Sequence, residues 1–305
     1  MKRKLLMTIP ILCLCVFAAK AQQEPIFSNY IWNPMAFNPA IAGSKSFTTM
    51  NLTIREQWVG FEGRPRTQAF NVHTPIKKKR IGVGASIIND NIGPINSTTL
   101  QGNFAYKFKV QRGVTLALGL KAEASLWQGK FAGLELADDP ALANNIRSAF
   151  LPNFGFGGLL KSKDYFVGIA APRLFTNEFN DGDANWNQGE QVRHFYLHGG
   201  YTFELKRNYY FKPNIMVNYV QNVPVDATIS ANFEFENQLW LGASYRAAQS
   251  ITPTVAYKFN NQIKAGYAYE FMVNNLISHQ WGSHELMITY DFYYRTGRVV
   301  NPIFF

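Results

Sequence analysis

Histidines supply the first side chains in this chain that could bind a metal ion. His194 and His198 share one face of a predicted strand, but the four-residue spacing separates them by about 13 Å. Two imidazoles at that distance cannot hold one ion without other ligands, so we interpret both as polar residues that face an interior. His279 and His284 flank a predicted turn, and no further ligand completes a site beside them. The sequence therefore predicts no metal site.

An acidic stretch near residue 181 resembles the start of a calcium-binding loop. Asp181, Asp183 and Asn185 have the spacing of the first three ligands. The sixth position of such a loop needs glycine and the twelfth needs glutamate, whereas this chain has Trp186 and Val192 there. We therefore interpret the stretch as a solvated loop.

Signatures of a catalytic site are missing from the sequence. It contains no nucleophile elbow, phosphate-binding loop, HExxH motif or paired-carboxylate signature. A hydrolytic membrane enzyme such as a lipase barrel would need a Ser-His signature, which is also missing. We therefore predict that the protein is not an enzyme, with no catalytic residues and no cofactor.

Charged residues recur at alternate positions within apolar segments. Alternation places them on one face of each predicted strand, opposite the apolar face, and in the barrel predicted below this face lines the lumen. A porin constriction needs such charges, but so does any barrel that satisfies polar groups in its interior, which leaves both an open and a plugged lumen to be considered. The predicted lumen residues are Lys121, Glu123, His194, His198, Asp226, Glu234, Arg246, Lys264, Glu270, Glu285 and Asp291.

Alternation of apolar and polar residues dominates the chain from residue 47 to 294. In 226–235, for example, Ala, Ile, Ala, Phe and Phe alternate with Asp, Thr, Ser, Asn and Glu. Nine or ten residues of this pattern suffice for a tilted strand to cross a membrane. We predict an all-β fold, a transmembrane antiparallel β-barrel of about 14 strands over 47–294. The predicted strands are 47–58, 66–75, 80–89, 98–108, 112–127, 152–162, 164–172, 192–204, 209–221, 225–236, 238–247, 250–259, 262–273 and 283–294.

The connections between these strands differ in length according to their order. The even-numbered connections are all tight, whereas the odd-numbered ones include every long loop. Short periplasmic turns and long extracellular loops are typical of outer-membrane barrels, so this pattern predicts the orientation and places both termini in the periplasm. The long loops are predicted at 59–65, 90–97, 128–151, 173–191 and 274–282.

Composition favours a membrane barrel and excludes other classes. The chain is 47% hydrophobic and 15% aromatic but only 16% charged, where soluble domains carry about a quarter. After the N-terminal leader no run of eighteen apolar residues occurs, which excludes a helical membrane protein. The net charge of +10 could indicate nucleic-acid binding. The signal peptide described next predicts export, which disfavours nucleic acid as a partner, and lysines that snorkel at strand ends account for the excess.

The first 21 residues have the features of a signal peptide. Lys2, Arg3 and Lys4 precede an apolar stretch, and residues 19–21 (Ala-Lys-Ala) place small residues where a signal peptidase cleaves. Cys15 follows leucine instead of the small residue of a lipobox, which disfavours a lipoprotein signal. We therefore predict export through a signal peptide at 1–21 and a mature protein surrounded by outer-membrane lipid.

The segment 22–46 precedes the predicted barrel. Its two Asn-Pro pairs, at 33–34 and 38–39, make turns and block a continuous helix or strand. Its apolar residues are too many for a free tail, so we predict either a plug inside the barrel or a segment that docks on a periplasmic partner. For the second case the predicted partner-binding residues are Phe27, Tyr30, Asn33, Pro34, Asn38, Pro39 and Gly43.

Two sequence blocks near the ends of the mature chain are distinctive. The first is Phe27-Ser28-Asn29-Tyr30 with Asn33–Ala40, and the second is Ser283–Ile288. In these blocks the chain resembles the PorP/SprF family, the barrel proteins of the type IX secretion system in Bacteroidetes. The resemblance extends over almost the whole mature chain. Further matching positions are 42–44, 55–58, 65–70, 82–84, 90, 93, 118–120, 152–155, 168–170, 240–246 and 266–270.

The resemblance implies a role in export or surface retention of large proteins, including gliding adhesins, without enzymatic activity. The expected partners are the C-terminal domain of a secreted adhesin and periplasmic components of the secretion system. A porin-like solute channel is the alternative, because the predicted lumen is charged. Members of the family usually end on an aromatic residue that closes the last strand, whereas here 295–305 continues past it. Either these residues form a C-terminal tail in the periplasm or the last strand lies later than predicted.

Overall fold

The computed structural model describes residues 27–76, 80–130, 146–178 and 190–293. The predicted signal peptide at 1–21, residues 22–26 and the predicted tail at 295–305 lie outside the described residues. The calcium-like stretch around Asp181 also lies outside them. No helix in the described part of the chain is both long and apolar enough to cross a membrane.

Each of the fourteen predicted strands is present in the structure. The eighth consists of two pieces, β10 and β11, interrupted at Thr202. The strands of the barrel are β1 (Thr48–Glu56), β2 (Arg66–Ile76), β3 (Ile81–Ile92), β4 (Ile95–Gln111), β5 (Val114–Gly129), β6 (Ile146–Lys161), β7 (Tyr165–Ala171), β10 (His194–Tyr201), β11 (Phe203–Lys206), β12 (Tyr209–Val220), β13 (Asp226–Phe235), β14 (Leu239–Arg246), β15 (Ser250–Lys258), β16 (Ile263–Met272) and β17 (Ser283–Phe292).

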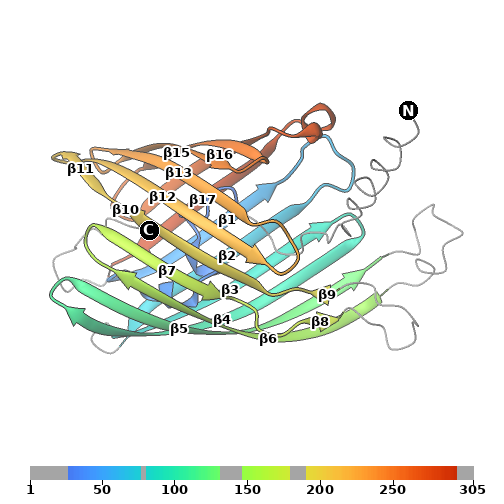
Figure 1. The fold of residues 1–305 in the computed structure, drawn as a ribbon, viewed down its shortest axis with the longest axis horizontal. Coiled ribbons are helices and arrows are strands. Elements are labelled where there is room, and N and C mark those ends of the chain that lie inside the picture. The colour runs from blue at the N-terminus through green and yellow to red at the C-terminus, as the bar shows by residue number, and fades with distance from the viewer. Residues whose placement is uncertain (1–26, 77–79, 131–145, 179–189, 294–305) are drawn as a thin grey trace, which may run out of the picture.

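These strands form a closed antiparallel barrel (Figure 1). Each strand pairs with its neighbour in sequence, β10 pairs with both β7 and β12, and β1 pairs with β17 to close the ring. Closure removes every free sheet edge, as hydrocarbon requires, because an unpaired backbone group has no water to bond there. The predicted all-β transmembrane barrel of 14 strands is therefore confirmed.

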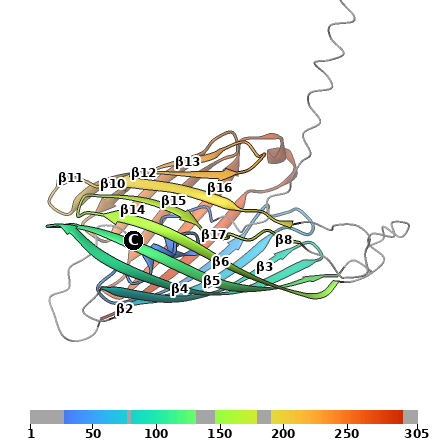
Figure 2. The ribbon, with the colours of Figure 1, turned by 60° about the horizontal axis from the view of Figure 1, so that its bottom comes forward.

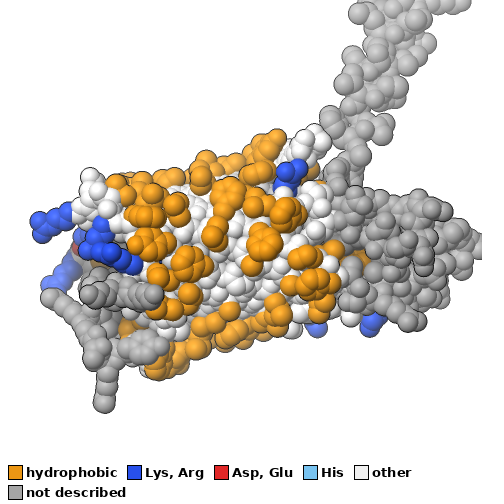
Figure 3. All heavy atoms as spheres, turned by 90° about the horizontal axis from the view of Figure 1, so that it is seen from below, with side chains coloured by type: hydrophobic (Ala, Val, Ile, Leu, Met, Phe, Trp, Pro, Cys, Tyr) orange, Lys and Arg blue, Asp and Glu red, His pale blue; other side chains and the backbone are white. Residues whose placement is uncertain are grey.

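The alternating pattern decides which side chains face lipid. On β17, Leu286 and Ile288 point outward and are exposed, while Glu285 and Thr289 point inward and are buried. The same alternation on the other strands covers the outside of the barrel with apolar side chains (Figure 3). The outer face thus suits lipid, and polar groups are confined to the lumen.

Aromatic side chains gather at the strand ends next to the short turns. Tyr106 and Phe108 lie with ring centroids 4.8 Å apart, and Tyr257 and Phe259 lie 5.2 Å apart. Amphipathic aromatic rings prefer the level of the lipid headgroups, so these pairs mark one membrane interface.

Turn length follows the predicted parity. All described connections at one end of the barrel, on the left in Figure 1, are short. The outer hairpin of β8 (Asn177–Glu178) and β9 (Glu190–Gln191) lies at the other end. Positive φ angles of 51° at Glu236 and 56° at Asn237 make the tight hairpin between β13 and β14. In outer-membrane barrels the end with the shorter connections faces the periplasm, so we call this end the periplasmic end.

The predicted long loop at 90–97 is wrong. Strand β3 continues to Ile92 and β4 begins at Ile95, so the connection is a two-residue turn at Gly93-Pro94, with a φ of 54° at Gly93. Polar side chains form hydrogen bonds with one another along this hairpin. Asn89 Nδ2, for example, donates to Thr98 Oγ1 at 2.9 Å. The polar residues that suggested a loop therefore extend the strands beyond the length that crosses a membrane.

Candidate functional site: the lumen and its plug

Residues 27–46, called the plug from here on, lie inside the barrel (Figures 1 and 2). The plug contains two short 3₁₀ turns, η2 (Pro34–Ala36) and η3 (Pro39–Ile41), and each begins at the proline of an Asn-Pro pair. Proline fits the first helical position because its missing N–H would have no partner there. Asn38 caps the second turn, since its Oδ1 accepts a hydrogen bond from the Ala40 amide at 3.0 Å.

Glycines in the barrel wall make room for the plug. A Cβ atom on Gly82 would lie 1.8 Å from the Ala42 carbonyl oxygen, and one on Gly119 would lie 2.2 Å from the Ala40 nitrogen. Such distances are far below van der Waals contact, so only glycine lets the two backbones approach this closely. These glycines, with Gly157 and Gly266, are called the seat of the plug.

Asn38 and His198 fix the middle of the plug to the seat. The Asn38 amide nitrogen lies 2.9 Å from His198 Nε2 and donates to the Gly158 carbonyl at 3.2 Å. The Phe37 ring packs edge-on against His198, with centroids 5.1 Å apart. A Cβ on Gly157 would lie 2.2 Å from Asn38 Oδ1. The two predicted lumen histidines do not act as a pair, because His194 bonds separately to Asn218.

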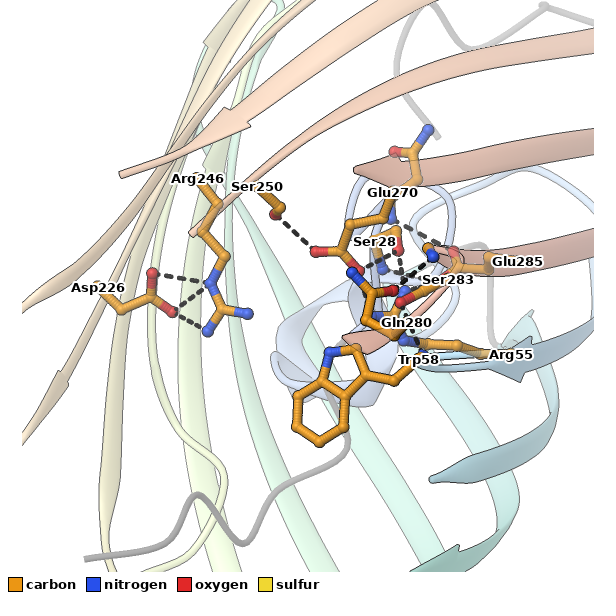
Figure 4. A network of polar contacts seen from close by, with 12 residues as sticks. Ser28, Arg55, Trp58, Asp226, Arg246, Ser250, Glu270, Gln280, Ser283 and Glu285 are labelled. Atoms are coloured by element: carbon orange, nitrogen blue, oxygen red, sulfur yellow. Dashed lines mark hydrogen bonds and ion pairs between the residues drawn. The ribbon is translucent and has the colours of Figure 1, made fainter. Parts of the chain in front are cut away.

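A buried charge cluster holds the other end of the plug (Figure 4). Arg55 of β1 forms ion pairs with Glu270 of β16 and Glu285 of β17. The backbone amides of Ser28 and Asn29 donate to the Glu285 carboxylate at 2.6 and 3.3 Å. Each charge in this buried cluster thus has an ionic partner, as burial of charge requires, although Arg55 Nε has no hydrogen-bond partner.

Arg55 was not among the predicted lumen residues. It alternates with the outward-facing Ile54 and shares the inner face of β1 with Thr53 and Asn51. The alternation that identified the other lumen residues was therefore sufficient to find it.

Several of the other predicted lumen residues form separate ion pairs along the wall. Lys121 and Arg173 both bind the Glu123 carboxylate, at 2.6 and 2.5 Å. Arg246 binds both oxygens of Asp226. Lys212, which was not predicted, pairs with Glu234. These charges thus pair locally, within a strand or with an adjacent segment, and do not form one ring.

The plug leaves a hollow on each side. Phe27, Tyr30 and Phe37 line the outer hollow together with Lys121 and Arg173. Burial raises the pKa of Tyr30 to about 12, so its hydroxyl stays neutral and shares a hydrogen bond with Ser230.

The second hollow, called the periplasmic hollow, adjoins the short turns. It is lined by Trp32 and Lys45 of the plug and by wall residues that include Lys264 and Asp291. Lys45 forms an ion pair with Asp291 at 3.3 Å. Burial lowers the pKa of Lys45, and the Asp291 carboxylate opposes that shift.

The family model for the type IX secretion system membrane protein PorP/SprF matches residues 19–290. This chain belongs to the PorP/SprF family. The residues that match the family model include the plug, the seat and nearly all of the barrel. No curated protein matches the chain significantly.

Solved structures share the fold of this PorP/SprF protein at low identity. A FadL homologue from Pseudomonas aeruginosa is 12% identical, with a TM-score of 0.51, over 88% of this chain and 95% of the other. The CymD monoaromatic hydrocarbon channel is 11% identical, with a TM-score of 0.50, over 89% and 96%. These similarities identify an outer-membrane β-barrel fold and nothing finer.

The positions that carried the family resemblance meet inside the barrel. The Asn-Pro block of the PorP/SprF protein forms the plug, and the glycine-containing matches at Gly82, Gly119 and Gly266 lie in the seat. Glu285, from the closing block, binds the plug backbone. The residues predicted to bind a partner, including Phe27, Tyr30, Asn33 and Asn38, are buried here, and their role toward a partner stays a prediction.

Proposed function

We propose that this protein is a non-enzymatic outer-membrane barrel of the type IX secretion and gliding machinery. It acts in export or cell-surface anchoring of large adhesin-type cargo. To do so it binds the C-terminal domain of the cargo or periplasmic components of the secretion system. Membership of the PorP/SprF family supports this setting.

The seated plug is the observation that carries the proposal. Wall glycines, the fully buried Asn38 and the Arg55–Glu285 cluster make it part of the folded barrel. A lumen occupied in this way offers no room for cargo, because packed interiors yield only at a cost in free energy. Contacts with cargo and machinery therefore fall to the surfaces at the two ends of the barrel.

The outer end offers the larger surface. Strands β4, β5 and β6 contain 17, 16 and 16 residues, more than the 9–11 that cross a membrane. The predicted contact loops at 128–151 and 173–191 follow β5 and β7. The first is shorter than predicted, since β5 continues to Gly129 and β6 begins at Ile146, and residues 131–145 and 179–189 lie outside the described residues. Loops on a rigid scaffold are common binding surfaces.

Deletion of the gene tests the proposal. We expect one large adhesin to disappear from the cell surface while other outer-membrane proteins stay at normal levels, and the full-length chain should restore it. A chain in which a Gly-Ser linker replaces 177–191 should insert normally but fail to restore display if the outer hairpin binds cargo. Unchanged display of every large secreted protein in the deletion strain would contradict the proposal.

A porin-like channel is the second candidate, because charged side chains line the lumen and a hollow lies on each side of the plug. Planar-bilayer recordings of the purified barrel separate the two. A barrel that holds its plug should pass no steady current. A steady current from the wild-type chain would favour the channel.

A further inference from the structure

The periplasmic hollow opens at the end of the barrel where the short turns lie. Its wall includes Asn260, Asn261 and Gln262 of the turn between β15 and β16, and Trp32 of the plug covers its inner side. Lys and Arg side chains also stand out at this end of the barrel on the face shown in Figure 3. A molecule in the periplasm can therefore reach the hollow without crossing the membrane.

Positive charge is in excess in the hollow. Its lining includes the lysines Lys45, Lys212, Lys258 and Lys264 and the carboxylates Glu234 and Asp291. Both carboxylates are already engaged, since Lys212 pairs with Glu234 and Lys45 with Asp291. The excess therefore resides on Lys258 and Lys264.

Lys258 and Lys264 lie directly opposite each other on β15 and β16. Like charges in this cross-strand position repel and destabilise the sheet. Neither lysine forms an ion pair with a carboxylate in the described ranges of the chain, and Asp291 and Glu234 attract Lys264 only from beyond ion-pair distance. An anionic group placed between the two ammonium groups would remove the repulsion.

Aromatic and amide side chains surround this lysine pair. The Lys264 ammonium lies 5.3 Å from the centroid of the Trp240 ring, and Trp32 and Tyr293 complete an aromatic wall. Asn214 and Asn232 add amide groups that can bond to a peptide backbone. Lysines, aromatic rings and amides together match a peptide that carries carboxylates and apolar side chains. Lipid is disfavoured as a ligand, because the hollow lies on the lumen side of the wall.

We propose that the periplasmic hollow binds an acidic peptide segment of a periplasmic partner. Carboxylates of the segment bind between Lys258 and Lys264, and a neighbouring apolar side chain packs on Trp240. This inference deepens the proposed function and rests on it for the presence of a periplasmic partner. The binding step itself can be measured on the purified barrel.

Fluorescence anisotropy with the refolded full barrel in detergent tests the site. The probe is a short labelled peptide of alternating Asp and Phe, and its counterpart has Asn in place of Asp. We expect the acidic peptide to bind and the neutral one to bind at least tenfold more weakly. The double variant Lys258→Gln/Lys264→Gln should lose about tenfold in affinity, which is about 1.4 kcal/mol.

The matched control is Lys109→Gln/Lys163→Gln, which removes the same charge from exposed positions at the same end of the barrel but outside the hollow. We expect its affinity to stay within twofold of wild type. Equal binding by both double variants, or equal binding of both peptides, would overturn the inference. So would saturation of the site by inorganic phosphate with no binding of the acidic peptide.

Measurement of adhesin display on the cell surface, together with peptide binding, distinguishes failure of this inference from failure of the proposed function. If deletion of the gene abolishes display but the acidic peptide does not bind, the inference fails and the proposed function stands. If the peptide binds as expected but display is unchanged in the deletion strain, the proposed function fails and the hollow remains a peptide site. Heat-modifiable migration in gels checks that each variant is folded.

Discussion

Arg55 and Glu285 lie directly opposite each other across the seam where the first strand meets the last, and the plug binds the same carboxylate through Ser28. Barrel closure and plug seating therefore share one buried charge cluster. Loss of the positive charge would leave Glu270 and Glu285 buried without their ion-pair partner.

We predict that Arg55→Gln lowers the free energy of unfolding by about 3–5 kcal/mol, because it breaks a buried ion pair and leaves its partners behind. Arg64→Gln is the matched control. Arg64 pairs with Glu56 in a half-exposed position, and such a pair contributes about 0–1 kcal/mol. Urea titration of the folded barrel in lipid vesicles measures both values. Equal free energies of unfolding for the two variants would show that the Arg55 cluster contributes no more to stability than an exposed ion pair does.

The second prediction concerns the glycines of the seat and whether they keep the plug in the lumen. Gly157 and Gly158 are adjacent on β6, but an added Cβ on Gly157 meets Asn38 at 2.2 Å whereas one on Gly158 meets Ile169 at 3.6 Å, an ordinary contact. We expect Gly157→Val to push the plug off its seat and Gly158→Val to leave it in place.

Planar-bilayer recording measures this difference. The Gly157→Val barrel should show steady or flickering current, while wild type and Gly158→Val should stay closed. If the Gly157→Val barrel migrates normally in gels and passes no current, the barrel wall accommodates the added side chain without releasing the plug, and the prediction is wrong.

Much of the fold follows from local pattern, and the departures have physical causes. All fourteen strands were predictable because one face meets lipid and the other the lumen, which imposes a period of two. The turn at Gly93-Pro94 was not predicted, since hydrogen bonds between polar side chains such as Asn89 and Thr98 extend a strand without an apolar pattern.

The position of the plug could not be decided from the sequence. Ser28 and Glu285 are 257 residues apart, and no local pattern records a contact over that separation. The glycines of the seat were visible in the sequence, but their meaning depends on what approaches them. Gly82 is a wall residue whose neighbour, Ala42, belongs to the plug.

Asn38 gives a third prediction. Asn38→Ala removes the cap of η3 and the hydrogen bonds to Gly158 and His198, so we expect a loss of about 2 kcal/mol and a plug that opens more often. The control is Asn261→Ala in an exposed periplasmic turn, which should cost less than about 0.5 kcal/mol. Denaturant unfolding gives the energies, and single-channel recording gives the opening frequency.

The lipid face gives the last prediction. Ile288 points outward from the middle of β17, opposite Leu52 of β1. An arginine near the membrane midplane of a barrel costs about 2–4 kcal/mol, so we expect Ile288→Arg to lose that amount while Ile288→Leu stays within about 0.5 kcal/mol of wild type. Unfolding in lipid vesicles measures both. Since the substitution leaves the lumen untouched, Ile288→Arg should weaken the barrel without opening it to current, which distinguishes it from Gly157→Val. Current through the Ile288→Arg barrel would mean that the position of the plug depends on the stability of the pairing between β1 and β17.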